Sequence, residues 1–124
     1  MNEDNTKSDE WFEKGRRDLE AAGLILRYSG HPDPAAMLLQ QTMEKYLKGF
    51  LIGKGWKLIK THNLKYLLDE CVKHSPGFER YYDLGIKLTK YYIDEKYPPM
   101  STEITPEEAG ALYIQVGELL KIIK

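Results

Sequence analysis

Apolar residues recur every three or four positions through most of the chain, and short clusters of glycine and proline separate these stretches. This spacing places the apolar side chains on one face of an α-helix, whereas a half-buried strand would alternate with a period of two. No stretch of the sequence alternates for long enough to predict a strand. The sequence therefore predicts an all-α fold in which each helix buries one face.

Four long helices and one short helix are predicted, each with its own apolar stripe. In chain order the stripes are Trp11, Gly15, Leu19, Ala22 and Leu26; Ala36, Leu39, Met43, Leu47, Phe50 and Leu51; Leu64, Leu67, Leu68 and Cys71; Phe78, Tyr81, Leu84, Leu88 and Tyr91; and Ala109, Leu112, Val116, Leu119 and Ile123. Short loops between long helices predict an antiparallel up-and-down four-helix bundle, with the short additional helix after the second long helix lying across one end. Residues 1–7 are predicted to be a disordered tail, and residues 8–124 a single helical domain.

Small polar residues mark where these helices are expected to begin. Ser8, Asp33 and Thr105 are predicted N-caps, and either Thr61 or Asn63 is predicted to cap the short helix. Such side chains accept hydrogen bonds from backbone N–H groups that the first helical turn leaves without partners. Asp33 and Thr105 are each followed by proline, which suits the first helical position.

The composition of the 124 residues excludes several classes of protein. The single cysteine, Cys71, cannot form an intramolecular disulfide, and no apolar run is long enough to span a membrane. These features predict a cytoplasmic protein. The sequence has no glycine-rich phosphate loop, zinc-binding cysteine pattern or metal-spaced histidine pair, so neither a cofactor nor a metal is predicted.

The distribution of charge is more informative than the net charge of −1. Residues 45–68 contain six lysines and no acidic residue, whereas the remaining chain carries 12 basic and 19 acidic residues, a balance of −7. A protein with so little net charge has no general basic field for nucleic acid. The sequence instead predicts a local cationic region that suits one anionic ligand.

Three motifs in order resemble those of the HEPN domain family. Residues 40–48, Gln-Gln-Thr-Met-Glu-Lys-Tyr-Leu-Lys, resemble the QQAxEKxLK pattern of its second helix. Residues 61–64, Thr-His-Asn-Leu, are similar to the family's T-H-[DN]-L, and residues 91–98 resemble its Y-Y-x-x-x-R-Y-P. The resemblance covers roughly residues 9–123.

The resemblance implies a helical bundle that usually dimerises. Some members of the family are ribonucleases, often toxins, with an R-x(4–6)-H motif; others bind nucleotides, and many accompany a minimal nucleotidyltransferase. In this sequence Arg27 and His31 have only three residues between them, and no histidine follows Arg80. Without an imidazole beside the arginine, the acid–base partner for RNA cleavage is missing. We therefore expect binding rather than catalysis, and RNA is a less expected ligand than a nucleotide.

The predicted ligand-binding residues combine the cationic region with the family motifs. They are Lys45, Lys48, His62, Tyr92, Lys96 and Tyr97. The lysines and His62 are expected to contact a phosphate, and a tyrosine to stack on a base. Lys96 replaces the family's arginine and lacks its planar, bidentate fork. The alternatives are a solvated helix face for the lysines and a structural role in the connector for His62.

Three functions follow as hypotheses. The first is a non-catalytic module that binds a nucleotide or other phosphate-bearing ligand as a homodimer, and the second is a partner of a minimal nucleotidyltransferase. The third is a HEPN ribonuclease toxin of a toxin–antitoxin pair. Leu38 and Ile52 widen the apolar face of the second helix, which favours a second contact such as a dimer face.

Overall fold

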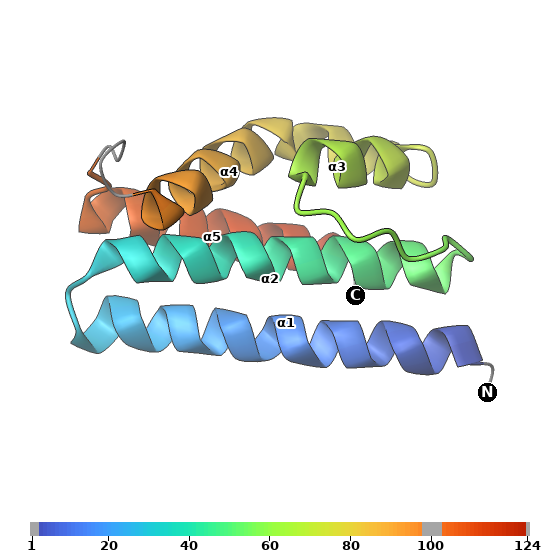
Figure 1. Ribbon diagram of the computed structural model, residues 1–124, viewed down its shortest axis with the longest axis horizontal. Helices are drawn as coiled ribbons and strands as arrows, with labels where there is room; N and C mark the ends of the chain where they lie inside the picture. The colour runs from blue at the N-terminus through green and yellow to red at the C-terminus, as the bar shows by residue number, and fades with distance from the viewer. Residues whose placement is uncertain (1–2, 98–102, 124) are drawn as a thin grey trace.

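The computed structural model describes residues 3–97 and 103–123, and within them the chain forms helices and no strand. The elements are α1 (Glu3–Tyr28), α2 (Pro32–Gly53), α3 (Leu64–Val72), a 3₁₀ helix (Pro76–Tyr81), α4 (Tyr82–Lys96) and α5 (Pro106–Ile123) (Figure 1). The predicted all-α fold is confirmed, as is the short helix after the second long one.

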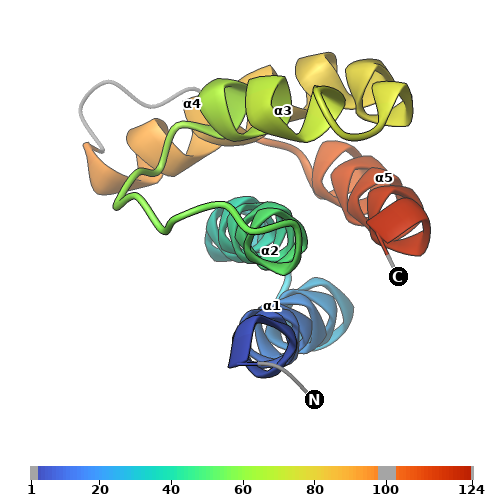
Figure 2. The same cartoon turned by 90° about the vertical axis from the view of Figure 1, so that its right-hand side faces the viewer.

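Helix α2 lies at the centre of the molecule. It contacts each of the other four α-helices, whereas α1 contacts only α2 and, over a smaller area, α5. The end-on view shows α1 on one side of α2, α3 and α4 on the other, and α5 beside them (Figure 2). Consecutive long helices run in opposite directions (Figure 1), but their packing centres on α2.

The central position of α2 explains its unusual apolar width. Leu38 packs against the hydrophobic core of its own chain, and Ile52 is only 6% exposed. Both residues were expected to widen the apolar face toward a partner. Burial within the chain accounts for Ile52, and Leu38 is half-buried against the core, so this width arises within one chain and a dimer face here stays a prediction.

Two glycines allow α1 and α2 to approach closely. A Cβ atom on Gly15 would lie 2.7 Å from the Tyr46 ring, and one on Gly49 would lie 2.7 Å from the Phe12 ring. The two rings also contact each other, with their centres 5.3 Å apart. Each ring therefore lies over a glycine of the opposite helix, and a larger residue at either position would push the helices apart.

The first two helices begin earlier than predicted. Helix α1 begins at Glu3, so residues 3–7 of the predicted tail belong to this helix, while residues 1 and 2 lie outside the described part. Ser8 is not an N-cap, because it lies within α1 and its hydroxyl donates to the carbonyl oxygen of Gly49 at 2.8 Å. Helix α2 begins at Pro32, after an extended His31, so Asp33 lies in the first turn instead of capping it.

The later caps agree better with the sequence. The side-chain oxygen of Asn63 accepts from the backbone N–H of Tyr66 at 3.0 Å, and that of Thr105 accepts from Glu108 at 3.1 Å. The fourth predicted helix is divided, because Phe78 and Tyr81 lie in the 3₁₀ helix and α4 begins only at Tyr82. Among the described residues, none of these helices has the length and apolar character that crossing a membrane requires.

Candidate functional site

The candidate site is built on Glu44, a carboxylate in the middle of α2 that is only 7% exposed. It accepts a hydrogen bond from Lys48 Nζ at 2.9 Å and another from Gln40 Nε2 at 3.2 Å. Gln40 and Lys48 are each four residues from Glu44, so all three lie on one helical face. A buried charge is tolerated when it is paired and hydrogen-bonded, and these neighbours supply both.

The connector between α2 and α3 adds His62 to this group. Its Nδ1 atom lies 2.9 Å from Glu44 Oε1, while 68% of the side chain is exposed. Asn63, the next residue, caps α3 and so fixes the end of the connector. A carboxylate oxygen accepts hydrogen bonds, so the contact fits an Nδ1–H donor with Nε2 left toward solvent.

Helix α4 completes the group with Tyr92 and Lys96, one turn apart. The centres of the His62 and Tyr92 rings lie 5.9 Å apart, and Lys96 Nζ lies 4.7 Å from the centre of the Tyr92 ring. Contact with the Tyr92 side chain raises the pKa of Lys96 above its ordinary value, so the ammonium stays charged at neutral pH. Gln40, Glu44, Lys48, His62, Tyr92 and Lys96 are called the Glu44 cluster below.

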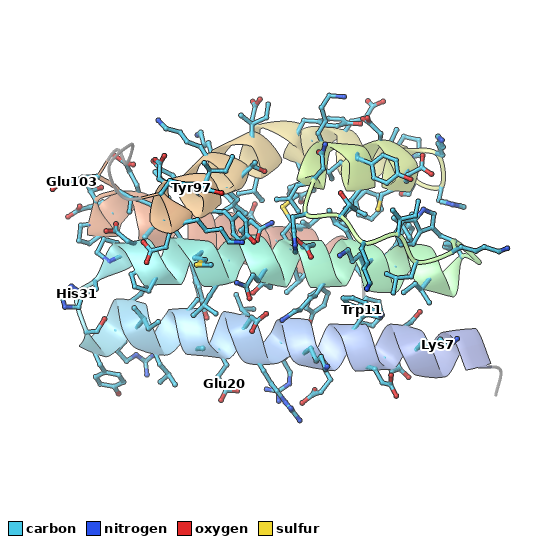
Figure 3. All side chains as sticks on the ribbon, in the orientation of Figure 1. Lys7, Trp11, Glu20, His31, Tyr97 and Glu103 are labelled. Atoms are coloured by element: carbon cyan, nitrogen blue, oxygen red, sulfur yellow. The ribbon has the colours of Figure 1, made fainter. Side chains whose placement is uncertain are left out.

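Lys48 differs from the other cations of the cluster because it is buried. Only 4% of the residue is exposed, and its ammonium lies 5.4 Å from the centre of the Trp11 ring on α1. Figure 3 shows Trp11 on the side of α1 that faces α2. The charge of Lys48 is thus compensated inside the protein by Glu44 and by the face of an aromatic ring.

The other two predicted site residues, Lys45 and Tyr97, make different contacts. Lys45 forms an ion pair with Asp18 of α1, so its ammonium is directed away from Glu44 and toward the helix interface. Tyr97 is 58% exposed and follows the last residue of α4, where its backbone N–H donates to Ile93. The structure therefore brings together Lys48, His62, Tyr92 and Lys96.

Glu44 itself was not among the predicted site residues. It immediately precedes the acid-free segment 45–68, so the count of charges in that segment omitted the acid that pairs with Lys48. The four-residue spacing from Gln40 to Glu44 to Lys48 was the available signal. Gln40 is fully buried, and its Oε1 atom has no hydrogen-bond partner among the described residues.

Comparison with known families adds a finding to this geometry. The HEPN domain model matches residues 8–124, nearly the whole chain. The chain belongs to the HEPN domain family. Comparison with curated proteins and comparison with solved structures each gave no significant match.

Every residue of the Glu44 cluster lies in one of the three motifs that resemble the HEPN family. The first motif supplies Gln40, Glu44 and Lys48, the second supplies His62, and the third supplies Tyr92 and Lys96. Three segments that lie far apart in the chain thus meet around His62, which contacts Glu44 of the first motif through Nδ1 and the Tyr92 ring of the third motif through its own ring. The proline that ends the third motif lies outside the described residues.

The cluster combines one exposed imidazole, one exposed ammonium and a tyrosine ring between them. These groups can contact an anion, whereas Glu44 and Lys48 beneath them hold His62 in place. No arginine is among the residues that contact one another here, and Arg27 lies instead over the ring of Tyr28. Within residues 3–97 and 103–123, no three His, Cys, Asp or Glu side chains gather as they would around a metal ion.

Proposed function

We propose that this HEPN domain is a non-catalytic module that binds a nucleotide or another phosphate-bearing ligand at the Glu44 cluster. The observation that carries the proposal is the convergence of all three family motifs around His62, which contacts Glu44 on one side and Tyr92 on the other, with His62 and Lys96 exposed. Because Lys48 compensates the charge of buried Glu44, the positive charge of Lys96 and the imidazole of His62 are left at the exposed surface.

The roles of the two lysines in this proposal differ. The ammonium of Lys96 lies at the surface beside Tyr92 and can meet a phosphate oxygen directly, which makes a charge-assisted hydrogen bond. Lys48 is buried against Glu44 and Trp11, so it acts as a positioning residue. Tyr92 is partly exposed, and its ring offers a surface on which a base can stack.

A thermal-shift experiment with AMP and ATP tests this proposal. Nucleotide at about millimolar concentration is expected to raise the melting temperature of the wild-type protein, because a ligand that binds only the folded state stabilises it. His62→Ala with Lys96→Ala should abolish the rise, whereas Lys14→Ala with Lys121→Ala removes two exposed lysines elsewhere and should retain it. A rise that survives loss of both His62 and Lys96 contradicts the proposed site.

We further propose that the domain acts as a homodimer, partners a minimal nucleotidyltransferase, or does both, in the cytoplasm. The family membership supports this proposal. Light scattering of the purified protein measures the oligomer, and co-purification with a co-expressed nucleotidyltransferase measures the partnership. A monomer that retains no such enzyme contradicts both parts.

A ribonuclease toxin is the second candidate, and the contact between Glu44 and His62 favours it. A carboxylate on Nδ1 orients an imidazole so that Nε2 can exchange a proton with a substrate, the arrangement of general acid–base catalysis. Expression of the chain alone distinguishes this candidate. Growth arrest with RNA decay that His62→Gln prevents would replace the binding proposal, and normal growth would support it.

A further inference from the structure

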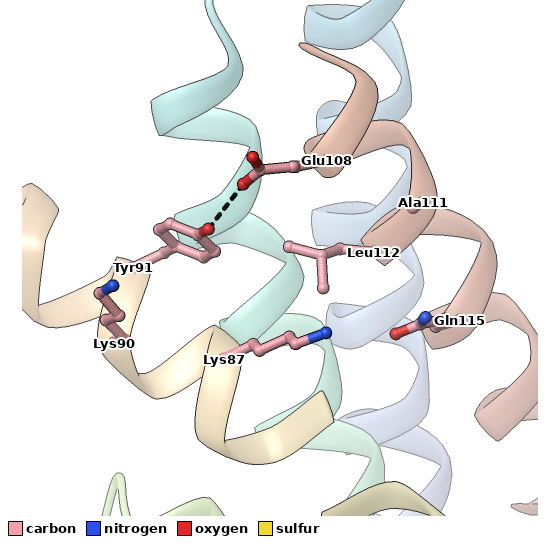
Figure 4. A pocket seen from close by; sticks show the side chains of 7 residues that line it. All are labelled: Lys87, Lys90, Tyr91, Glu108, Ala111, Leu112 and Gln115. Carbon is pink, nitrogen blue, oxygen red and sulfur yellow. Dashed lines mark hydrogen bonds between the residues drawn. The ribbon is translucent and has the colours of Figure 1, made fainter. Parts of the chain in front are cut away.

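A cavity lies between α4 and α5, and no residue of the Glu44 cluster lines it. Its volume is about 320 Å³, within the range in which proteins bind small molecules. The lining residues are Lys87, Lys90, Tyr91, Glu108, Ala111, Leu112 and Gln115 (Figure 4). Tyr91 and Tyr92 are adjacent on α4, so neighbouring residues belong to different sites.

The two ends of this cavity differ in charge. At one end the Tyr91 hydroxyl donates to a carboxylate oxygen of Glu108 at 2.8 Å. At the other end Lys87 extends toward Gln115, and Leu112 lies between the two ends (Figure 4). The cavity therefore offers a hydrogen-bond acceptor, an apolar wall and a cation in that order.

The lysines of the cavity are not used by the protein itself. Figure 4 shows the Lys87 side chain extended across the cavity toward Gln115 on α5. Neither Lys87 nor Lys90 forms an ion pair with any residue that the structure describes. The ammonium group of Lys87, beside Leu112 and Gln115, is therefore available to an external anion, and Lys90 lies next to Tyr91.

We propose that the cavity between α4 and α5 binds a small molecule with an anionic group at one end and an amino group at the other. The anion meets Lys87 and the side-chain amide of Gln115, and Lys90 adds positive charge from beside Tyr91. The apolar body lies on Leu112, and the amino group donates to Glu108, which the Tyr91 hydroxyl holds in place. This site is independent of the nucleotide site proposed above.

A titration with 4-aminobenzoate tests the assignment, because that probe has a carboxylate, a flat apolar ring and an amine in the required order. The side-chain amide of Gln115, followed by ¹⁵N NMR, is expected to shift and saturate with a Kd in the range of about 1–10 mM. Benzoate, which lacks the amine, is expected to bind at least about threefold more weakly because it cannot donate to Glu108.

Matched variants locate the binding. The double variant Lys87→Gln with Lys90→Gln should raise the Kd for 4-aminobenzoate by about fivefold or more, since the charge-assisted hydrogen bond to its carboxylate is lost. Lys14→Gln with Lys121→Gln removes the same charge elsewhere, and His62→Ala with Lys96→Ala disables only the other site; both should bind as the wild type does. No saturable shift of Gln115 overturns the proposal, as does affinity that Lys87 and Lys90 do not affect or that depends on His62 and Lys96.

Discussion

The ammonium nitrogen of Lys48 lies 2.9 Å from a carboxylate oxygen of Glu44, and both side chains are almost completely buried. Removing one member of a buried pair leaves the other charge without compensation, which typically costs about 3–5 kcal/mol. We expect Glu44→Gln to destabilise the protein by an amount near that range, measured by urea denaturation.

The double variant Glu44→Gln with Lys48→Met provides the control for this prediction. It removes both charges, so a large part of the lost stability should return. Glu79→Gln, at an exposed position on the 3₁₀ helix, should change the free energy of unfolding by less than about 0.5 kcal/mol. A double variant no more stable than Glu44→Gln would mean that the pair is not the source of the effect.

The ion pair between Lys45 and Asp18 predicts a structural role for a lysine that the sequence assigned to the ligand. Lys45→Ala should lower the free energy of unfolding by about 1 kcal/mol or less, since partly exposed pairs contribute modestly. It should leave the nucleotide-induced rise in melting temperature unchanged. If Lys45→Ala loses that rise while Asp18→Ala keeps it, Lys45 contacts the ligand after all.

The glycines of α1 and α5 predict opposite effects of the same substitution. In Gly15→Ala the new methyl group would meet the Tyr46 ring at 2.7 Å, so we expect destabilisation by about 1–3 kcal/mol. Gly110, in the helical interior of α5, has open space at its Cβ position. Gly110→Ala should stabilise by about 0.5–1 kcal/mol, because alanine favours the helix. Thermal denaturation of both variants checks the signs, and equal effects would contradict close packing at Gly15.

The thiol of Cys71 is expected to be unreactive in the folded protein. Burial raises the pKa of the thiol to about 12, so almost no thiolate forms at pH 8. A disulfide reagent should therefore label Cys71 slowly in buffer and rapidly in concentrated urea, where the pKa returns to about 8.5. Rapid labelling in buffer would show that α3 does not stay packed on α2.

The apolar spacing predicted α1, α2, α3 and α5 because burial follows directly from the 3.6-residue period, whereas the stripe that begins at Phe78 covers a 3₁₀ helix and α4. Leu64 and Cys71 are buried as their spacing requires, and Asn63 caps α3, the helix that contains both of them. Ser8 shows where such local signals end. A serine before two acids resembles a cap, but its hydroxyl instead bonds to Gly49, 41 residues away. No local pattern contains that contact.

Local sequence patterns also predicted part of the candidate site but not all of it. His62, Tyr92 and Lys96 were named because each lies in a motif, and the structure places them in contact. The partner of Lys45 depended on packing between helices, because Asp18 lies on α1, whereas the partner of Lys48 lies four residues away on the same helix. Lys45 and Lys48 are three residues apart, yet one pairs with α1 and the other with Glu44 on its own helix.

Helix α1 is attached to the rest of the molecule almost entirely through α2, and this has a consequence for hydrogen exchange. Because α1 contacts α2 and a smaller part of α5 but neither α3 nor α4, it can detach as a unit while the other helices stay assembled. Its amides are expected to exchange through such an opening at a lower free energy than those of α2. Each opening would also move Trp11 away from Lys48 and admit water to a cation that the closed protein hides.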